Sequence, residues 1–399
     1  MRVLFFVEGF TDIRFVVGLS EICDLTLAVP ARAYRESGLD ERLRESGARV
    51  TVQLIEGSRL AFQARSFAYL WRVAPSFDVI LAQEMLRGAL NAPLVGALRG
   101  VPVVTYMGIS PIEYFRCRRE RGQIGPAAAA LGEAAIRTLM TISGRLASTA
   151  LVMGPYLASV AAPFSRRVAI GRYYGVDVDL FRPATAAEKT ALRNRLDLPR
   201  DAFLIVLSSR ISHEKDPETV LQAAACARAR GLDVVLLNLG GGYQEFLALA
   251  AASGVPDAAR WVLARPACHP MKGLADYYRA ADALVQGSLE EGLGFSPLES
   301  LACEVPTIAS AVGGLAAHLG DVAVLTPRRD AIAMASAILQ IASDPGAARA
   351  RARRGREYVV RDWNRARAFD ELHQVLTEAA GRALRRLPCA VPSVDAERI

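Results

Sequence analysis

Cysteine, histidine, lysine and aromatic side chains are all scarce in this sequence of 399 residues. The six cysteines are widely spaced and form no C-x-x-C pair, which argues against a zinc site or a redox couple and favours reduced thiols. Aromatic residues make up only 7%, and the basic residues, nearly all arginine, lack the interleaved aromatics of a base-stacking surface. We therefore expect no nucleic-acid partner, although the formal net charge is +7.

An uninterrupted apolar run long enough to cross a bilayer is also lacking. The stretch 146–165 carries no charge, but Gly154, Pro155 and Pro163 interrupt it. The first residues, MRVLFFVEG, reach Glu8 too soon for a signal peptide and are better read as a strand. We expect a cytoplasmic protein.

The apolar residues fall into short runs separated by helical patterns. Such runs are typical of buried parallel strands joined by crossover helices. Two series of six occur: 3–7, 24–29, 50–54, 78–81, 101–106 and 150–153, then 203–208, 234–239, 261–263, 283–286, 307–310 and 322–325. The pattern predicts the α/β class, with two doubly wound, Rossmann-like sheets.

A linker between the two sheets is expected near residue 183, where Gly175, Pro183 and polar residues interrupt regular structure. We predict a first domain over 1–183 and a second over 184–380, whose last helices pack back on the first domain. Residues 381–399 form a flexible tail in this interpretation. Ligands of doubly wound sheets bind beyond the carboxyl ends of the strands, so a central cleft between the domains is the expected site.

The loop after the first strand of the second series carries two cations. Arg210 and Lys215 lie in R-I-S-H-E-K-D-P-E, where Asp216 can cap a helix that has Pro217 at its first position. Two cations beside exposed helical N–H groups suit a diphosphate. Solvated surface charges are the alternative for this loop taken alone.

The most informative segment is S-L-E-E-G-L-G-F-S-P-L-E-S-L-A-C-E-V-P, over 288–306. It places Glu291 and Glu299 eight positions apart, with a glycine-rich loop and a helix start at Ser296 between them. Backbone N–H groups and two carboxylates in this arrangement suit the hydroxyls of a nucleotide sugar. For Glu299 a capping box with Ser296 is an equally good interpretation.

These residues resemble family 4 of the retaining glycosyltransferases, the group 1 glycosyltransferases, which have the GT-B fold. The shared features are E-x(7)-E at Glu291 and Glu299, the Arg210 and Lys215 pair, and three shorter motifs: G-V-D…F from Gly175 to Phe181, Ala281-Asp282 and Gly313-Gly314. The resemblance covers about residues 170–330 and implies an N-terminal acceptor domain and a C-terminal donor domain.

The resemblance implies a retaining, metal-independent transfer of a sugar from a nucleotide diphosphate sugar to an unidentified acceptor. Glu291, Arg210 and Lys215 would be catalytic. The donor would be held by Arg210, Lys215, Gly292, Leu293, Gly294, Phe295, Ser296, Leu298 and Glu299, with Glu291 on the sugar and Glu299 on the ribose. Neither cofactor nor metal is expected, although Asp177 and Asp179 mimic a D-x-D metal motif.

The amino-terminal half departs from the family. Met107 stands where many members have a histidine, and all four histidines lie in the second half of the sequence. Gly9, Phe10, Thr11 and Asp12 form a first loop without the usual double glycine and are candidates for acceptor or phosphate binding. A capped first helix explains Thr11 and Asp12 equally well.

Three further interpretations stay open. A nucleotide-sugar epimerase of the same fold would need an acid and a base in the cleft, and a non-catalytic nucleotide-sugar-binding module would be supported by Met107. The basic segment from Arg116 to Arg121 is either solvated or makes a peripheral contact with anionic lipid on the inner membrane face.

Overall fold

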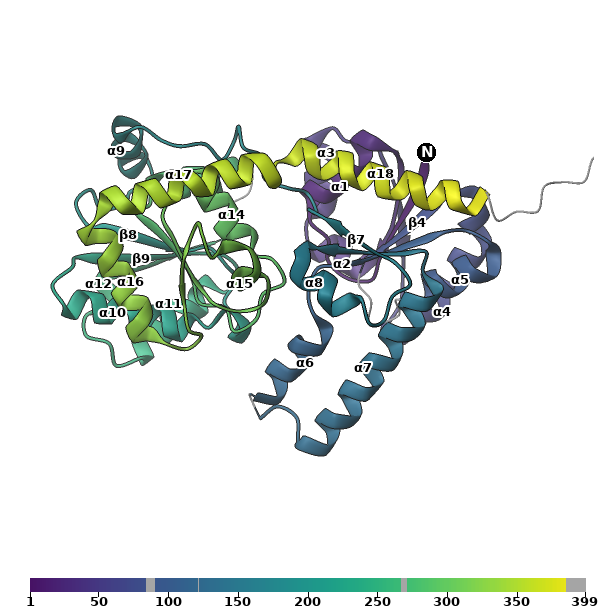
Figure 1. Ribbon diagram of the computed structural model, residues 1–399, viewed down its shortest axis with the longest axis horizontal. Helices are drawn as coiled ribbons and strands as arrows, with labels where there is room; N and C mark the ends of the chain where they lie inside the picture. Colours follow the sequence, from purple (N-terminus) through teal and green to yellow (C-terminus); the bar gives the residue numbers. More distant parts are fainter. Residues whose placement is uncertain (84–89, 121, 267–270, 385–399) are drawn as a thin grey trace, which may run out of the picture.

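The computed structural model describes residues 1–83, 90–120, 122–266 and 271–384. Its two lobes lie side by side, and each is built around one parallel sheet (Figure 1). The first sheet has the order β3-β2-β1-β4-β5-β6-β7 and the second β10-β9-β8-β11-β12-β13. This architecture confirms the predicted α/β class with two doubly wound sheets.

The strands match the predicted runs closely. The first sheet contains β1 Arg2–Val7, β2 Asp24–Pro30, β3 Val50–Ile55, β4 Val79–Gln83, β5 Val103–Met107, β6 Thr149–Met153 and β7 Val168–Gly171. The second contains β8 Phe203–Leu207, β9 Val234–Leu239, β10 Val262–Arg265, β11 Ala283–Gln286, β12 Thr307–Ser310 and β13 Val324–Thr326. Only β7 was not predicted.

Helices cover both faces of each sheet. In the first lobe they are α1 Ile13–Ile22, α2 Ala31–Glu36, α3 Leu39–Ser46, α4 Arg59–Val73, η1 Ala74–Ser76, α5 Asn91–Arg99, α6 Pro111–Glu120, α7 Pro126–Leu146 and α8 Gly154–Ala161. In the second they are α9 Ala186–Arg195, η2 His213–Lys215, α10 Pro217–Ala229, α11 Tyr243–Ala252, α12 Ala258–Trp261, α13 Met271–Ala280, α14 Phe295–Ala302, α15 Gly313–Leu319, α16 Ala331–Ser343 and α17 Pro345–Asp362. The last helix, α18 Arg365–Leu384, returns to the first lobe.

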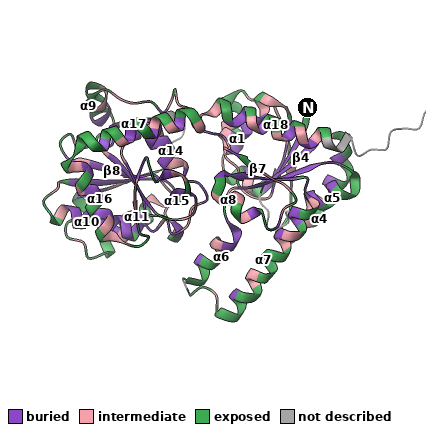
Figure 2. Cartoon of the chain, viewed as in Figure 1, coloured by how far each residue is buried: buried purple, intermediate pink, exposed green. Residues whose placement is uncertain are grey.

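Alternation along β1 shows how the first core is divided. Phe5 packs edge-on against Phe15 of α1, with ring centroids 5.4 Å apart. Phe6 points to the other face and stacks on Phe62 of α4, at 6.1 Å. Successive side chains of a strand face opposite ways, so a strand buried on both faces is apolar throughout. The sheets are accordingly the buried interior of each lobe (Figure 2).

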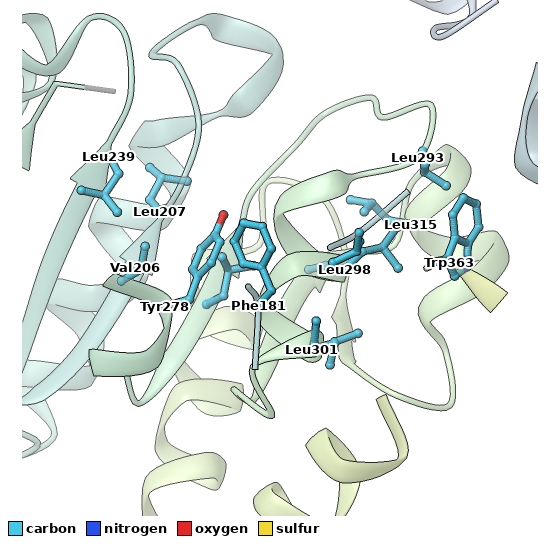
Figure 3. Packing of buried hydrophobic residues seen from close by; sticks show 14 of the residues in the cluster. Phe181, Val206, Leu207, Leu239, Tyr278, Leu293, Leu298, Leu301, Leu315 and Trp363 are labelled. Carbon is cyan, nitrogen blue, oxygen red and sulfur yellow. The ribbon is translucent and has the colours of Figure 1, made fainter. Parts of the chain in front are cut away.

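The second core extends from its sheet to the segment that joins the lobes. Phe181, which follows the first lobe, packs against Tyr278 of α13 with ring centroids 6.0 Å apart (Figure 3). Asp282, just before β11, accepts hydrogen bonds from Lys189 Nζ at 2.6 Å, Arg193 Nη2 at 2.5 Å and the Leu204 amide at 2.7 Å. The Ala281-Asp282 motif therefore has a structural role, tying α9 to the sheet.

The chain crosses between the lobes twice, and the two crossings are hydrogen-bonded to each other. The Val176 amide donates to Trp363 O at 2.7 Å, and the Arg365 amide donates to Val176 O at 2.9 Å. After the second crossing α18 packs on α1 and β7, so that α17 and α18 run along one edge of both lobes (Figure 1). The paired crossings fix where the lobes meet.

No helix among the described residues is long and apolar enough to span a membrane. The interrupted stretch 146–165 instead contains the end of α7, β6 and α8. The predicted tail 381–399 lies outside the described residues from 385 onward.

Candidate functional site

The donor-side loops meet where strand order reverses in the second sheet. Strands β8 and β11 are neighbours, and β9 and β12 lie on their outer sides. Crossovers leave in opposite directions at such a switch point, so the loops that follow the two strands leave a crevice between them. Arg210 and Lys215 follow β8, and Glu291 follows β11.

The loop after β8 ends in a capped helix, as predicted. Asp216 accepts hydrogen bonds from the Thr219 amide at 3.4 Å and the Thr219 hydroxyl at 2.7 Å, and Pro217 is the first residue of α10. The single 3₁₀ turn η2 before this cap brings the ammonium group of Lys215 to the crevice. The guanidinium of Arg210 is mostly exposed and pairs with Glu214 at 2.7 Å.

Glu291 is the centre of a compact polar cluster. Its Oε2 accepts hydrogen bonds from Lys215 Nζ at 2.5 Å, Ser288 Oγ at 3.1 Å and Gln286 Nε2 at 3.2 Å. The side chains of Lys215 and Glu291 are 18% and 15% exposed, so water weakens their ion pair only partly. The structure thus joins two residues that lie 76 positions apart in the chain.

Close backbone packing holds the glycine-rich loop that follows Glu291. The Gly314 amide donates to Glu291 O at 2.8 Å, and His318 Nε2 lies 2.8 Å from Leu293 O. A Cβ atom on Gly314 would overlap the carbonyl oxygen of Gly292. The Gly313-Gly314 pair therefore lets α15 support the loop directly.

The capping box considered for Glu299 is absent. Helix α14 begins at Phe295 with Gly294 as its N-cap, and Ser296 Oγ donates instead to Ser208 O at 2.7 Å. The predicted start at Ser296 was one residue late, because Gly294 adopts a φ of 93° and turns the chain into the helix earlier. The side chain of Glu299 therefore does not cap the N-terminus of α14.

Glu299 is engaged by the other lobe. Its Oε1 accepts a hydrogen bond from Arg14 Nη1 of α1 at 2.6 Å, and its Oε2 accepts one from the Tyr278 hydroxyl at 3.3 Å. Burial raises the pKa of Glu299, and the positive charge of Arg14 opposes that rise. Arg14 was not among the predicted site residues, since its partner lies 285 positions away.

Asp12 holds Arg14 in place. It is the N-cap of α1, accepting from the Arg14 amide at 2.9 Å, and its two oxygens accept from Nε at 3.0 Å and Nη2 at 2.8 Å. Burial would raise the pKa of Asp12, but Arg14 outweighs burial and lowers it. Asp12 therefore caps the first helix, which was one of the two interpretations of this residue. Of the other residues of the first loop, Gly9 and Thr11 are half-buried and Phe10 is 60% exposed.

A cavity of about 270 Å³ lies over the switch point. Most of the predicted donor residues line it, and Met153 of the first lobe closes one side. Its lining includes Arg210, Lys215, Glu291, Leu293, Gly294, Phe295 and Ser296, while Gly292, Leu298 and Glu299 are buried outside it. Two cations, a carboxylate and the first turn of α14 therefore face one space.

Met107 and the Asp177-Val178-Asp179 string both have structural roles. Met107 is 2% exposed in the first core at the end of β5. Asp177 Oδ1 accepts hydrogen bonds from the Asp179 amide at 3.2 Å and the Leu180 amide at 3.0 Å, which places the apparent D-x-D string in a turn.

The basic segment belongs to the hairpin of α6 and α7, which stands out from the first lobe (Figure 1). Arg116 donates to both oxygens of Glu133 on α7, at 3.1 and 2.7 Å, and Arg118 donates to Gln123 at 3.2 Å. Arg121 lies outside the described residues. A membrane contact of this hairpin stays a prediction.

Comparisons with known proteins place these loops in a family. The family model described as glycosyl transferases group 1 matches residues 188–358. D-inositol 3-phosphate glycosyltransferase of Thermobispora bispora is 32% identical over 339 residues, which cover 79% of this chain and 74% of the relative. D-inositol 3-phosphate glycosyltransferase 1 of Catenulispora acidiphila is 32% identical over 70% of this chain and 67% of its own length. The chain belongs to the group 1 glycosyltransferases.

Two solved structures share the whole architecture. HepE of Anabaena in complex with UDP superposes with a TM-score of 0.77 over 95% of this chain and all of its own, at 15% identity. Sucrose-phosphate synthase of Thermosynechococcus elongatus gives a TM-score of 0.71 over 96% of this chain and all of its own, at 19% identity. The fold of this glycosyltransferase is therefore GT-B, as the sequence resemblance implied.

Proposed function

We propose that this glycosyltransferase transfers a sugar from a nucleotide diphosphate sugar to a hydroxyl acceptor with retention of anomeric configuration, without a metal ion. The observation that carries the proposal is the cavity in which Lys215, Arg210 and Glu291 meet the first turn of α14. HepE has been solved with UDP and with UDP-glucose, which supports a nucleoside diphosphate at the corresponding crevice.

In this proposal, Arg210 and Lys215 stabilise the charge of the leaving diphosphate. When the sugar leaves, negative charge develops on the diphosphate, and preorganised cations at that point lower the barrier most effectively. Each cation now has a carboxylate partner, Glu214 or Glu291, that holds it in position. In this proposal the two cations, once they face the diphosphate, would take the place of a metal ion.

Glu291 suits a binding role better than a nucleophilic one. Three donors already point at its Oε2, which stabilises the carboxylate and lowers its readiness to attack carbon. In the proposed front-face step, the bond between the anomeric carbon and the phosphate oxygen breaks and the acceptor oxygen bonds to that carbon on the same face. The departing phosphate oxygen takes the proton of the acceptor hydroxyl.

The test begins with the donor. Isothermal titration with UDP-, GDP- and ADP-sugars identifies the nucleotide, and release of the nucleoside diphosphate is then followed with and without acceptors, among them inositol 3-phosphate, the substrate named for the relatives. We expect transfer that survives EDTA and a product whose NMR coupling shows the donor's anomeric configuration. An inverted product, a requirement for added metal or epimerised donor would each reject the proposal.

The residue assignment is tested separately. Glu291→Gln should lower kcat by roughly 100-fold or more, because the neutral amide forms no ion pair with Lys215 and is a weaker acceptor for a sugar hydroxyl. Glu357→Gln on α17, an exposed carboxylate of the same lobe, is the matched control and should retain full activity. A Glu291→Gln enzyme with unchanged kcat would remove Glu291 from the reaction.

A further inference from the structure

Arg14 joins the first lobe to a carboxylate of the second at a buried position. Nη1 of Arg14 lies 2.6 Å from Glu299 Oε1, and the two side chains are 26% and 4% exposed. The guanidinium also donates to the Tyr174 hydroxyl at 2.5 Å and lies 3.9 Å above the ring of Tyr174. Water screens this contact much less than it screens an ion pair in open solvent.

Glu299 has no accessible oxygen left while Arg14 is in place. Arg14 holds Oε1, the Tyr278 hydroxyl lies against Oε2, and Tyr278 itself is fully buried. The two hydroxyls of a ribose need carboxylate oxygens that they can reach and donate to. A side chain that is 4% exposed offers them no route.

Arg14 would keep its other partners if it left Glu299. Asp12 receives hydrogen bonds from Nε and Nη2, whereas the bond to Glu299 comes from Nη1. Loss of the Nη1 contact alone therefore leaves Arg14 its two hydrogen bonds to Asp12, and no bare positive charge results. Glu299 without Arg14, by contrast, would be a buried carboxylate that lacks its cation, a costly arrangement unless another donor replaces it.

We propose that Arg14 and the donor ribose compete for the carboxylate of Glu299, so that a residue of the first lobe sets the affinity of the second lobe for the nucleotide. The proposal rests on the proposed function and on the family resemblance, which implies that the donor ribose binds at Glu299. Arg14 acts here through Glu299 and is a positioning residue.

The competition predicts that removing Arg14 strengthens nucleotide binding. Arg14→Ala should bind the nucleoside diphosphate roughly tenfold more tightly, because the ribose no longer displaces a charged hydrogen bond. The gain should depend on the ribose hydroxyls. A 2′,3′-dideoxynucleoside diphosphate should bind the variant and the wild-type enzyme within about twofold of each other.

The experiment measures Kd by isothermal titration for UDP, GDP and ADP, and then for the best of them beside its 2′,3′-dideoxy form. Arg328→Ala is the matched control, since Arg328 pairs with Glu120 of α6 across the lobes at 3.2 Å and touches no part of the Glu299 cluster. We expect no gain from it. An equal gain in Arg328→Ala would assign the effect to looser lobes and overturn the proposal.

Other outcomes are equally decisive. Weaker UDP binding in Arg14→Ala, or an equal gain for the dideoxy ligand, would overturn the competition. If the alanine variant does not fold, Arg14→Lys replaces it, because lysine keeps the positive charge but cannot donate several hydrogen bonds from one planar group. Arg14→Lys should show a smaller gain in nucleotide affinity. A loss of affinity would overturn the proposal. If no nucleotide binds the wild-type enzyme at all, the proposed function fails instead.

Discussion

We expect Glu290, next to the central carboxylate of the site, to make the stability of the protein depend on pH. It lines a second cavity, of about 380 Å³, between α6 of the first lobe and the loops after β11 and β12. Its Oε2 is buried and accepts no hydrogen bond from the part of the chain that the structure describes. Burial first, and then the negative charges of Glu113, Glu214 and Glu291, raise its pKa from 4.5 to about 8, against a lowering by Lys215.

The difference in proton binding between the folded and unfolded protein sets the direction in which stability changes with pH. Between pH 4.5 and 8 the unfolded chain has released this proton while the folded protein keeps it, so the free energy of unfolding falls as pH rises through that window. At about 1.4 kcal/mol per unit of pKa shift, the free energy of unfolding would fall by about 5 kcal/mol at most. Because Glu290 is only partly buried, we discount this to roughly 1–2 kcal/mol.

Glu290→Gln removes the titration. Relative to the wild-type enzyme, the variant should gain roughly 1–2 kcal/mol in free energy of unfolding between pH 5 and pH 8.5. Urea unfolding at pH 5, 6.5 and 8.5 measures the difference, and Glu357→Gln on the exposed face of α17 controls for the loss of a negative charge. A difference that stays constant over this range would refute the reasoning.

Three further substitutions test other parts of the structure. Asp282→Asn should lower the free energy of unfolding by roughly 2–4 kcal/mol in urea melts, because a half-buried carboxylate with two cationic partners is lost. Gly314→Ala should raise the KM for the donor severalfold by pushing Gly292 away, whereas Gly320→Ala, which has open space, should not. Met107→His should cost roughly 2–3 kcal/mol of stability without raising kcat, since the side chain is 2% exposed in the core.

The sequence predicted the sheets well because buried parallel strands are continuous apolar runs, and flanking glycines and polar residues bound them. Twelve of the strands were predicted from such runs, including β3, a half-exposed edge strand of six residues. β7 was missed because it has only four residues at a sheet edge, of which only Gly171 is buried. A short, half-exposed run leaves little hydrophobic signal, so that strand is recognised only by its pairing with β6.

The site could be predicted where its residues are close in sequence. Glu291, the glycine loop and the start of α14 lie on one continuous segment, and Lys215 follows the neighbouring strand of the sheet. Which partner each side chain chooses could not be predicted in the same way. The S-x-x-E pattern at Ser296 is a good capping box by sequence, yet Glu299 pairs with Arg14, because folding brings α1 and α14 together across 285 positions.

The competition at Glu299 also links donor binding to the angle between the lobes. Arg14 belongs to the first lobe and Glu299 to the second, and the lobes are joined where Val176 pairs with the segment after α17. If the lobes rotate about those crossings, α1 moves relative to α14 and the ion pair between Arg14 and Glu299 separates. A ribose that displaces Arg14 therefore favours an orientation different from the one that Arg14 holds. Linkage requires the converse as well: a change that opens the lobes must raise nucleotide affinity by the same factor by which the nucleotide favours opening.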